Sequence, residues 1–208
     1  MRNHNIKAII FDLGNVLIDF DHTRAATRIS AFCAKTPDEI YRLFFDSEAT
    51  ALFEAGRITP QDFYLKVKEM LDLKLDYEGF LPVWNEIFFL SPKNDQVHEL
   101  AGRLKGRYKL ALLSNINTLH FDYLKKNFPV FDAFHKVIAS CDTGFIKPDP
   151  KIYQIALDSL GVSADETFYT DDRLELIESA QKLGLKSFIF TDSQKLKSDL
   201  LGEGVDIN

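Results

Sequence analysis

Residues 6–21, Ile-Lys-Ala-Ile-Ile-Phe-Asp-Leu-Gly-Asn-Val-Leu-Ile-Asp-Phe-Asp, are the part of the chain that decides the fold. Residues 8–11 are all apolar, which is typical of a strand buried on both faces of a parallel sheet. The run stops at Asp12, and Gly14 and Asn15 then indicate a tight turn. Open α/β sheets bind ligands at the carboxyl ends of such strands. An aspartate that only ends a strand gives the same pattern, so this segment alone does not assign a function.

Length and composition indicate a globular protein. The chain has 208 residues, enough for one large or two small domains, and 46% of them are apolar. The formal net charge is -6, and no run of Lys or Arg is long enough to follow a phosphate backbone or an anionic membrane. The composition therefore argues against nucleic acid as a partner.

The cysteines and the N-terminal segment indicate a cytoplasmic protein. Cys33 and Cys141 lie far apart, without metal-ligand spacing to histidine, as is typical of reduced thiols in a cytosol. Lys7 and Asp12 interrupt the first apolar segment, which leaves no signal-peptide core, and no apolar stretch is long enough to span a bilayer. We expect a soluble, cytoplasmic protein with no membrane partner.

Residues 23–89 are predicted to form consecutive helices without a strand between them. Thr36 and Thr59 are each followed by a proline at the first helical position, and the first of them also opens a capping box. Gly56 is placed to end the preceding helix. This part of the chain is predicted to be an all-helical insert.

After residue 91 the pattern alternates between helices and strands. The predicted strands are 108–113, 134–138, 167–170 and 186–190, and the predicted helices are 93–104, 119–128, 150–160, 174–183 and 193–201. This alternation predicts an α/β fold with a doubly wound parallel sheet. We expect an α/β core of residues 1–21 and 91–208, with residues 22–90 forming a helical cap over the carboxyl ends of the strands.

Polar side chains follow the predicted strands. Asp12, Ser114, Asp171 and Asp172 each come after an apolar strand, and Lys147 lies on a loop just before a helix. Strand ends converge in this architecture, so we expect these side chains to share one cleft. Crowded carboxylates repel one another unless a cation joins them, and oxygen ligands of this kind suit Mg²⁺. The sequence therefore predicts a magnesium site.

Four motifs resemble those of the haloacid dehalogenase-like (HAD) hydrolases. They are Phe-Asp-x-x-x-Val-Leu at 11–17, Leu-Leu-Ser-Asn at 112–115, Lys-Pro-Asp-Pro at 147–150 and Asp-Asp at 171–172. Their order and separations match the family, and the resemblance covers essentially the whole chain. It implies a Rossmann-like core with an inserted all-helical C1 cap.

The cap also resembles one subgroup of this family. Residues 53–58, Phe-Glu-Ala-Gly-Arg-Ile, and Trp84 look like the cap of the subgroup that contains α-D-glucose-1-phosphate phosphatase. The first motif has the Phe-Asp-Leu-Gly-Asn-Val form of that subgroup. The resemblance implies a Mg²⁺-dependent phosphatase of a small phosphorylated metabolite, with sugar phosphates, and sugar 1-phosphates in particular, as the expected substrates.

The resemblance also implies the roles of single residues. Asp12 would be both the nucleophile that forms an aspartyl-phosphate and a Mg²⁺ ligand. The backbone carbonyl of Gly14 and the side chain of Asp172 would complete the protein's share of the metal site, with Asp171 beside them.

The phosphoryl group would be held by three further residues. The Ser114 hydroxyl and the Asn115 backbone N–H would bind phosphoryl oxygens. Lys147 would neutralise charge and hold the carboxylates in place.

The chain departs from the family pattern at two positions. Most HAD phosphatases have a second aspartate, a general acid and base, where this chain has Gly14, and most have Asp or Asn where it has Leu176. A positioned acid contributes roughly 10²- to 10⁴-fold, so its loss favours substrates with an acidic leaving group. Leu176 predicts weaker Mg²⁺ binding or a rearranged surrounding of the metal. The sequence leaves the replacement for the missing acid open among Asp19, Asp21, His22 and a cap residue such as Glu54.

Two other functions are compatible with the sequence. A 2-haloacid dehalogenase shares the Asp nucleophile and needs no metal, but it gains nothing from carboxylates at Asp171 and Asp172. A HAD fold weakened at Gly14 and Leu176 could also serve as a binding or regulatory module. Asn15 is interpreted as an ordinary turn residue, and the oligomeric state is left open.

Overall fold

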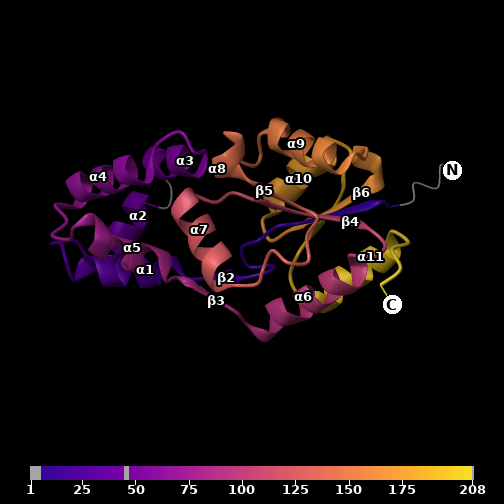
Figure 1. The fold of residues 1–208 in the computed structure, drawn as a ribbon, viewed down its shortest axis with the longest axis horizontal. Coiled ribbons are helices and arrows are strands. Elements are labelled where there is room, and N and C mark those ends of the chain that lie inside the picture. Colours follow the sequence, from indigo (N-terminus) through magenta and orange to yellow (C-terminus); the bar gives the residue numbers. More distant parts are fainter. Residues whose placement is uncertain (1–5, 45–46, 208) are drawn as a thin grey trace.

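The structure is a computed structural model that describes residues 6–44 and 47–207. The parts of the predicted core and cap formed by residues 1–5, 45–46 and 208 lie outside these ranges. The described chain forms an α/β body and a helical lobe at one side of it, on the left in Figure 1.

The body is built on a five-stranded, all-parallel sheet in the order β5-β4-β1-β6-β7. Its strands are β1 (Ala8–Phe11), β4 (Lys109–Ser114), β5 (Lys136–Ala139), β6 (Thr167–Asp171) and β7 (Lys186–Ile189). The first strand of the chain lies in the middle, between β4 and β6. The predicted doubly wound sheet is confirmed, and its strand ends differ from the predicted ones by at most two residues.

Helices cover both faces of the sheet (Figure 1). On one face lie α6 (Pro92–Leu104), α7 (Thr118–Asn127) and α11 (Ser193–Gly202), and on the other lie α9 (Pro150–Leu160) and α10 (Leu174–Lys182). Strand β1 serves both faces, because Ile9 and Phe11 point to the first and Ala8 and Ile10 to the second. Full burial of a side chain such as Phe11 stabilises the fold by about 1.5–3 kcal/mol.

Two short elements complete the body. They are α8 (Ser140–Thr143), which directly follows β5, and the 3₁₀ helix η1 (Ala164–Glu166), which precedes β6. The sequence pattern did not predict α8, because a single helical turn is too short to show a period.

The lobe consists of helices with a core of their own. It contains α1 (His22–Ser30), α2 (Pro37–Phe44), α3 (Glu48–Glu54), α4 (Pro60–Leu71) and α5 (Tyr77–Asn85). The predicted start signals are present, because Thr36 exchanges capping hydrogen bonds with Glu39, and Thr59 does so with Asp62. Aromatic rings fill the centre of the lobe, where Phe53 and Phe63 stack at 4.4 Å between ring centroids.

Two short strands connect the lobe to the body. β2 (Asp19–Phe20) and β3 (Phe88–Phe89) pair antiparallel, so the chain enters and leaves the lobe side by side. The prediction of a stretch without strands is therefore wrong at its end. A two-residue strand shows no period in the sequence, and β3 exists because the incoming strand β2 lies next to it.

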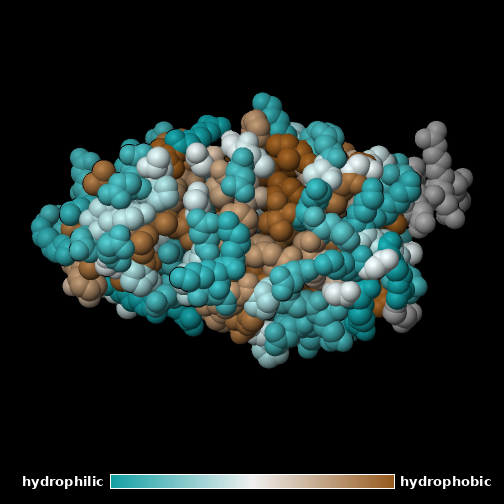
Figure 2. Space-filling view, viewed as in Figure 1, coloured by the Kyte–Doolittle hydropathy of each residue, from teal (hydrophilic) through white to brown (hydrophobic). Residues whose placement is uncertain are grey.

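Hydrophilic side chains cover most of the visible surface of the lobe and of α6, and apolar surface is more common near the middle of the molecule (Figure 2). Within residues 6–44 and 47–207, no helix has both the length and the apolar character that crossing a membrane requires.

Candidate active site

Three carboxylates meet at the carboxyl edge of the central strands. Asp12 follows β1 and Asp171 ends the neighbouring strand β6, whose Thr170 is in register with Phe11. Asp172 is the next residue, and ligand oxygens of these three side chains lie within 4.8 Å of one another. Parallel pairing of two strands thus brings together residues that are about 160 positions apart in the chain.

Lys147 joins two of these carboxylates. Its Nζ lies 2.6 Å from Asp12 Oδ1 and 2.7 Å from Asp171 Oδ2, and it donates to the carbonyl of Leu113 at 3.1 Å. The lysine is only 4% exposed and Asp171 is fully buried. Three acceptors hold the buried ammonium of Lys147 in one place. A charge can position a reacting group only if it is itself fixed in this way.

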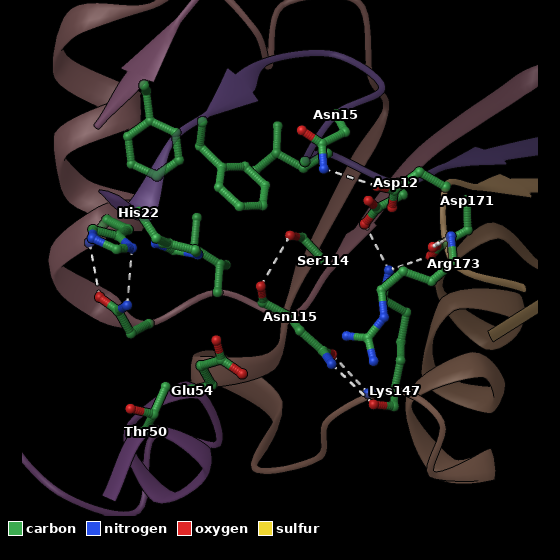
Figure 3. Close-up of a pocket in the computed structure, with 18 of the residues that line it drawn as sticks. Asp12, Asn15, His22, Thr50, Glu54, Ser114, Asn115, Lys147, Asp171 and Arg173 are labelled. Carbon is green, nitrogen blue, oxygen red and sulfur yellow. Dashed lines mark hydrogen bonds and ion pairs between the residues drawn. The ribbon is translucent and has the colours of Figure 1, made fainter. Parts of the chain in front are cut away.

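The side chain of Asn115 fixes the backbone of Lys147. Its Nδ2 donates to the Lys147 carbonyl at 2.9 Å, and its Oδ1 accepts the Lys147 N–H at 2.7 Å (Figure 3). The sequence predicted a role only for the backbone of Asn115, and this double hydrogen bond was missed. Nothing in the local pattern shows it, because the two residues lie on different loops.

The remaining contacts separate the roles of the carboxylates. Both oxygens of Asp171 already have partners, since Oδ2 accepts from Lys147 and from the Tyr169 hydroxyl, and Oδ1 accepts the Arg173 N–H at 3.0 Å. Asp172 Oδ2 accepts from Asn15 Nδ2 at 2.8 Å. Protein donors therefore occupy most of the lone pairs of Asp171, and Asp12 and Asp172 are better placed to offer oxygen lone pairs to a ligand.

Asn15 is another residue that the sequence analysis missed. It was interpreted as a turn residue, and its φ of 56° is indeed left-handed. That conformation directs its side chain to Asp172. An asparagine that forms a turn and one that also orients a carboxylate look the same in the sequence. The contact of Asn15 with Asp172 is therefore visible only in the structure.

The electrostatics of the cluster favour a cation. Burial, together with the charges of Asp171 and Asp172, raises the pKa of Asp12 to about 7, although Lys147 opposes the shift. Burial also raises the pKa of Asp172. When all three carboxylates are ionised, they and the Lys147 ammonium carry two net negative charges, which one divalent cation would balance. Hard oxygen donors of this kind fit Mg²⁺.

The other predicted site residues lie around the cluster. Ser114 ends β4, is 4% exposed, and lines the same cleft as Asp12, Gly14 and Asn115. The Ser140 hydroxyl accepts the Ile116 N–H at 2.9 Å and so fixes the loop that follows Ser114. The structure thus brings together the predicted residues from three strand ends and Lys147 from the loop before α9. Leu176 is buried and also lines the cleft.

The cleft has a volume of about 390 Å³ and lies between the body and the lobe. Its inner end holds the carboxylates and Lys147. Aromatic side chains also line the cleft, including Phe20, Trp84 and Phe88, together with polar ones such as His22 and Asn117, and Glu54 enters it from the end of α3. A small molecule with an anionic group and some apolar surface matches this mixed lining.

Phe20 also bears on the departure at Gly14. A Cβ atom on Gly14 would lie 2.6 Å from Cε1 of Phe20, a distance that real Cβ atoms do not show. The ring would therefore have to move before an aspartate could occupy this position. In this chain, the Phe20 ring lies against the position at which the family usually has its second acid.

The structure also separates the four candidates for the missing acid. Asp19 accepts from Ser91 at 2.7 Å and pairs with Lys93 at 2.7 Å, and Asp21 accepts from Thr23 at the start of α1. Neither aspartate lines the cleft, whereas His22 and Glu54 both do. Burial lowers the pKa of His22 to about 4 and raises the pKa of Glu54 to about 7.

His120 closes the cleft on the side of α7. Its ring stacks on Trp84 at 5.2 Å, and its nitrogens hydrogen-bond to the Asn117 side chain at 3.0 Å and the Trp84 carbonyl at 3.1 Å. Burial lowers its pKa to about 3, so the ring is neutral near pH 7. This histidine joins the body to the lobe.

The fold and the site correspond to a known family. The family model for haloacid dehalogenase-like hydrolases matches residues 6–184, and the chain belongs to this family. The predicted HAD-like class is therefore confirmed.

Three similar proteins match this chain over most of their own length. A sesquiterpene phosphatase of Aspergillus oryzae is 28% identical, over 90% of this chain and 91% of its own. A D-ribitol-5-phosphate phosphatase of Bacteroides thetaiotaomicron is 24% identical, over 88% and 91%. A HAD family enzyme of Bacteroides thetaiotaomicron, solved with magnesium and inorganic phosphate, has a TM-score of 0.79 and 28% identity, over 90% of this chain and 96% of its own.

Proposed function

We propose that this protein is a Mg²⁺-dependent phosphatase that hydrolyses a small phosphorylated metabolite through an aspartyl-phosphate. One observation carries the proposal: Asp12 is fixed by the buried Lys147 and lies within 4.8 Å of Asp171 and Asp172. Phosphatases among the relatives and a structural relative solved with magnesium and phosphate support it.

The proposed chemistry assigns each residue a task. Asp12 attacks phosphorus with a carboxylate oxygen, the bond to the leaving-group oxygen breaks, and water later hydrolyses the aspartyl-phosphate. Lys147 orients Asp12 and balances charge on the phosphoryl group, while Asp171 holds Lys147 in place. Ser114 and the backbone N–H of Asn115 bind phosphoryl oxygens.

The carboxylates also account for the cation. Asp12, Asp172 and the Gly14 carbonyl would hold Mg²⁺, with Asp171 beside them, and the ion would neutralise charge that develops on the phosphoryl oxygens. The same carboxylates argue against the dehalogenase alternative, because a metal-free site would have to keep two further negative charges beside its nucleophile.

The cleft suggests two substrate classes. A sugar phosphate, and in particular a sugar 1-phosphate, has a leaving group of moderate acidity, and its apolar ring face can stack on the aromatic side chains. A terpenoid monophosphate is the second candidate, because the aromatic side chains of Phe20, Trp84 and Phe88 line the cleft. The sesquiterpene phosphatase among the relatives favours this second class. The narrower resemblance to the glucose-1-phosphate phosphatase subgroup stays a prediction, as does a cytoplasmic location.

The test is phosphate release from a panel of sugar phosphates, a terpenyl monophosphate and an aryl phosphate, with Mg²⁺ and then with chelator. We expect turnover that chelator abolishes, and the preferred substrate then identifies the class. Asp12→Asn should remove turnover and leave the circular dichroism spectrum unchanged. A folded wild-type protein without phosphate release on any substrate would overturn the proposal, and would favour halide release or a binding role for this fold.

A further inference from the structure

The missing acid at Gly14 leaves a gap in the proposed reaction. When Asp12 attacks phosphorus, the leaving-group oxygen becomes an alkoxide unless a proton reaches it, and a positioned acid supplies that proton in phosphatases that cleave alkyl esters. Phe20 lies against Gly14, so the donor must approach from another side of the cleft. The following inference rests on the phosphatase function proposed above.

Few titratable groups of the described chain line the cleft away from the carboxylate cluster and its cations. They are His22, Tyr41, Glu54 and His120. Burial keeps both histidines neutral near pH 7, and a neutral imidazole is a very weak acid. Tyr41 is 43% exposed on α2. Of these four described residues, only Glu54 combines a position inside the cleft with an acidity suited to proton transfer near neutral pH.

The backbone around Glu54 is fastened to the body. The Ser140 hydroxyl donates to the Glu54 carbonyl at 2.6 Å, and the same oxygen accepts the N–H of Ile116, two residues after Ser114. One hydroxyl therefore links the end of α3 to the loop expected to hold the phosphoryl group.

Gly56 allows this close approach. Its φ is +64°, and a Cβ atom there would lie only 2.1 Å from the carbonyl oxygen of Cys141. Arg57 adds a contact from Nη2 to the carbonyl of Gly144 at 3.4 Å. The segment after α3 thus lies directly on α8, and the Glu54 carboxyl points into the cleft toward Ser114 and Asn115 (Figure 3).

We propose that Glu54 donates the proton to the leaving group in the first step and accepts a proton from water in the second. In the first step Asp12 forms a bond to phosphorus, the bond between phosphorus and the leaving-group oxygen breaks, and that oxygen takes the Glu54 proton. In the second step water attacks phosphorus, its proton passes to the Glu54 carboxylate, and the bond from Asp12 to phosphorus breaks. Glu54 ends the cycle protonated, as it began.

The surroundings of Glu54 suit both tasks. Burial raises its pKa to about 7, and the positive charges of Arg173 and Lys147 limit the rise. The acid and its conjugate base are then both populated near neutral pH, which is the condition for a group that must act in both directions.

The test compares leaving groups. We would measure kcat/KM of wild type and Glu54→Gln on p-nitrophenyl phosphate and on the best alkyl or sugar phosphate of the panel. Nitrophenolate needs no proton to leave, so its kcat/KM should change by less than about 3-fold, whereas the alkyl substrate should lose roughly 10²- to 10⁴-fold. Glu48→Gln, an exposed glutamate on the same helix, is the matched control and should change neither value.

Each other outcome has a defined meaning. An equal loss on both substrates, or no loss on the alkyl substrate, would overturn the role of Glu54 while leaving the phosphatase function intact. If Glu54→Gln fails to fold, Glu54→Asp keeps an acid at a shorter reach, and it too must lose more activity on the alkyl substrate than on the aryl one. Absence of phosphate release by the wild type would overturn the proposed function itself.

Discussion

His120 should make the protein sensitive to acid, and the size of the effect follows from its environment. Its ring is 5% exposed, and burial, with the nearby His22, lowers its pKa from 6.5 to about 3 in the folded protein. His120 therefore binds a proton below about pH 6.5 in the unfolded chain, but only below about pH 3 in the folded protein. A lowered folded-state pKa gives stability that is present above pH 6.5 and is lost as the pH falls.

The magnitude can be worked out from this shift. Each pH unit between the two pKa values costs about 1.4 kcal/mol, so His120 alone should remove about 3 kcal/mol of unfolding free energy between pH 7 and pH 4. That is a large part of the 5–15 kcal/mol that typically stabilises a domain.

The assay is urea denaturation at several pH values, followed by circular dichroism. Trp84, the single tryptophan, stacks on His120, so fluorescence would report the substitution itself. In His120→Gln the fall in unfolding free energy from pH 7 to pH 4 should be smaller than in the wild type by about 3 kcal/mol. Parallel curves for wild type and His120→Gln would refute the reasoning.

Two other substitutions test the carboxylate cluster and its neighbour. Lys147→Met should lower the unfolding free energy, measured in chelator, by about 3–5 kcal/mol, because Asp12 and Asp171 stay buried without the lysine ammonium. Urea denaturation measures this loss. An unchanged denaturation midpoint would contradict the prediction. Gly14→Asp should lower kcat/KM because the new side chain displaces the Phe20 ring, and adding Phe20→Ala should recover activity by making room. Phosphate release by the single and double variants decides, and a Gly14→Asp variant as active as the wild type would show that the ring moves freely.

The sequence predicted the body of the fold well because its signals are local. The apolar run of β1 and the proline at the start of α9 are properties of neighbouring residues, and the elements that were predicted after residue 91 end within two residues of their predicted positions. The position of Asp12 at a strand end also followed from local pattern. Parallel pairing of β1 with β6 then determined which residues became its neighbours.

The contacts that organise the site could not be predicted in this way. Three such contacts join segments whose separation depends on the paths of loops. They are the contacts of Asn115 with Lys147, of Asn15 with Asp172, and of Phe20 with Gly14. Glu54 was one of four open candidates until the structure placed two of the others outside the cleft. Hydrogen bonds between loops produce no periodic pattern in a sequence. The strands could therefore be predicted, whereas the roles of these single side chains were missed.

The pairing of β2 with β3 has a consequence for how such a chain can change over time. Because Asp19 lies opposite Phe89, the lobe begins and ends at neighbouring points of the body. The entropy cost of bringing these two ends together rises only slowly with the length of the lobe. The lobe also buries its own aromatic cluster. An insertion with adjacent ends and its own core can be lengthened, trimmed or replaced without disturbing the sheet that carries Asp12. Substrate choice can therefore evolve in the lobe while Asp12 and Lys147 stay where they are, but a replaced lobe would also have to replace the proton donor proposed at Glu54.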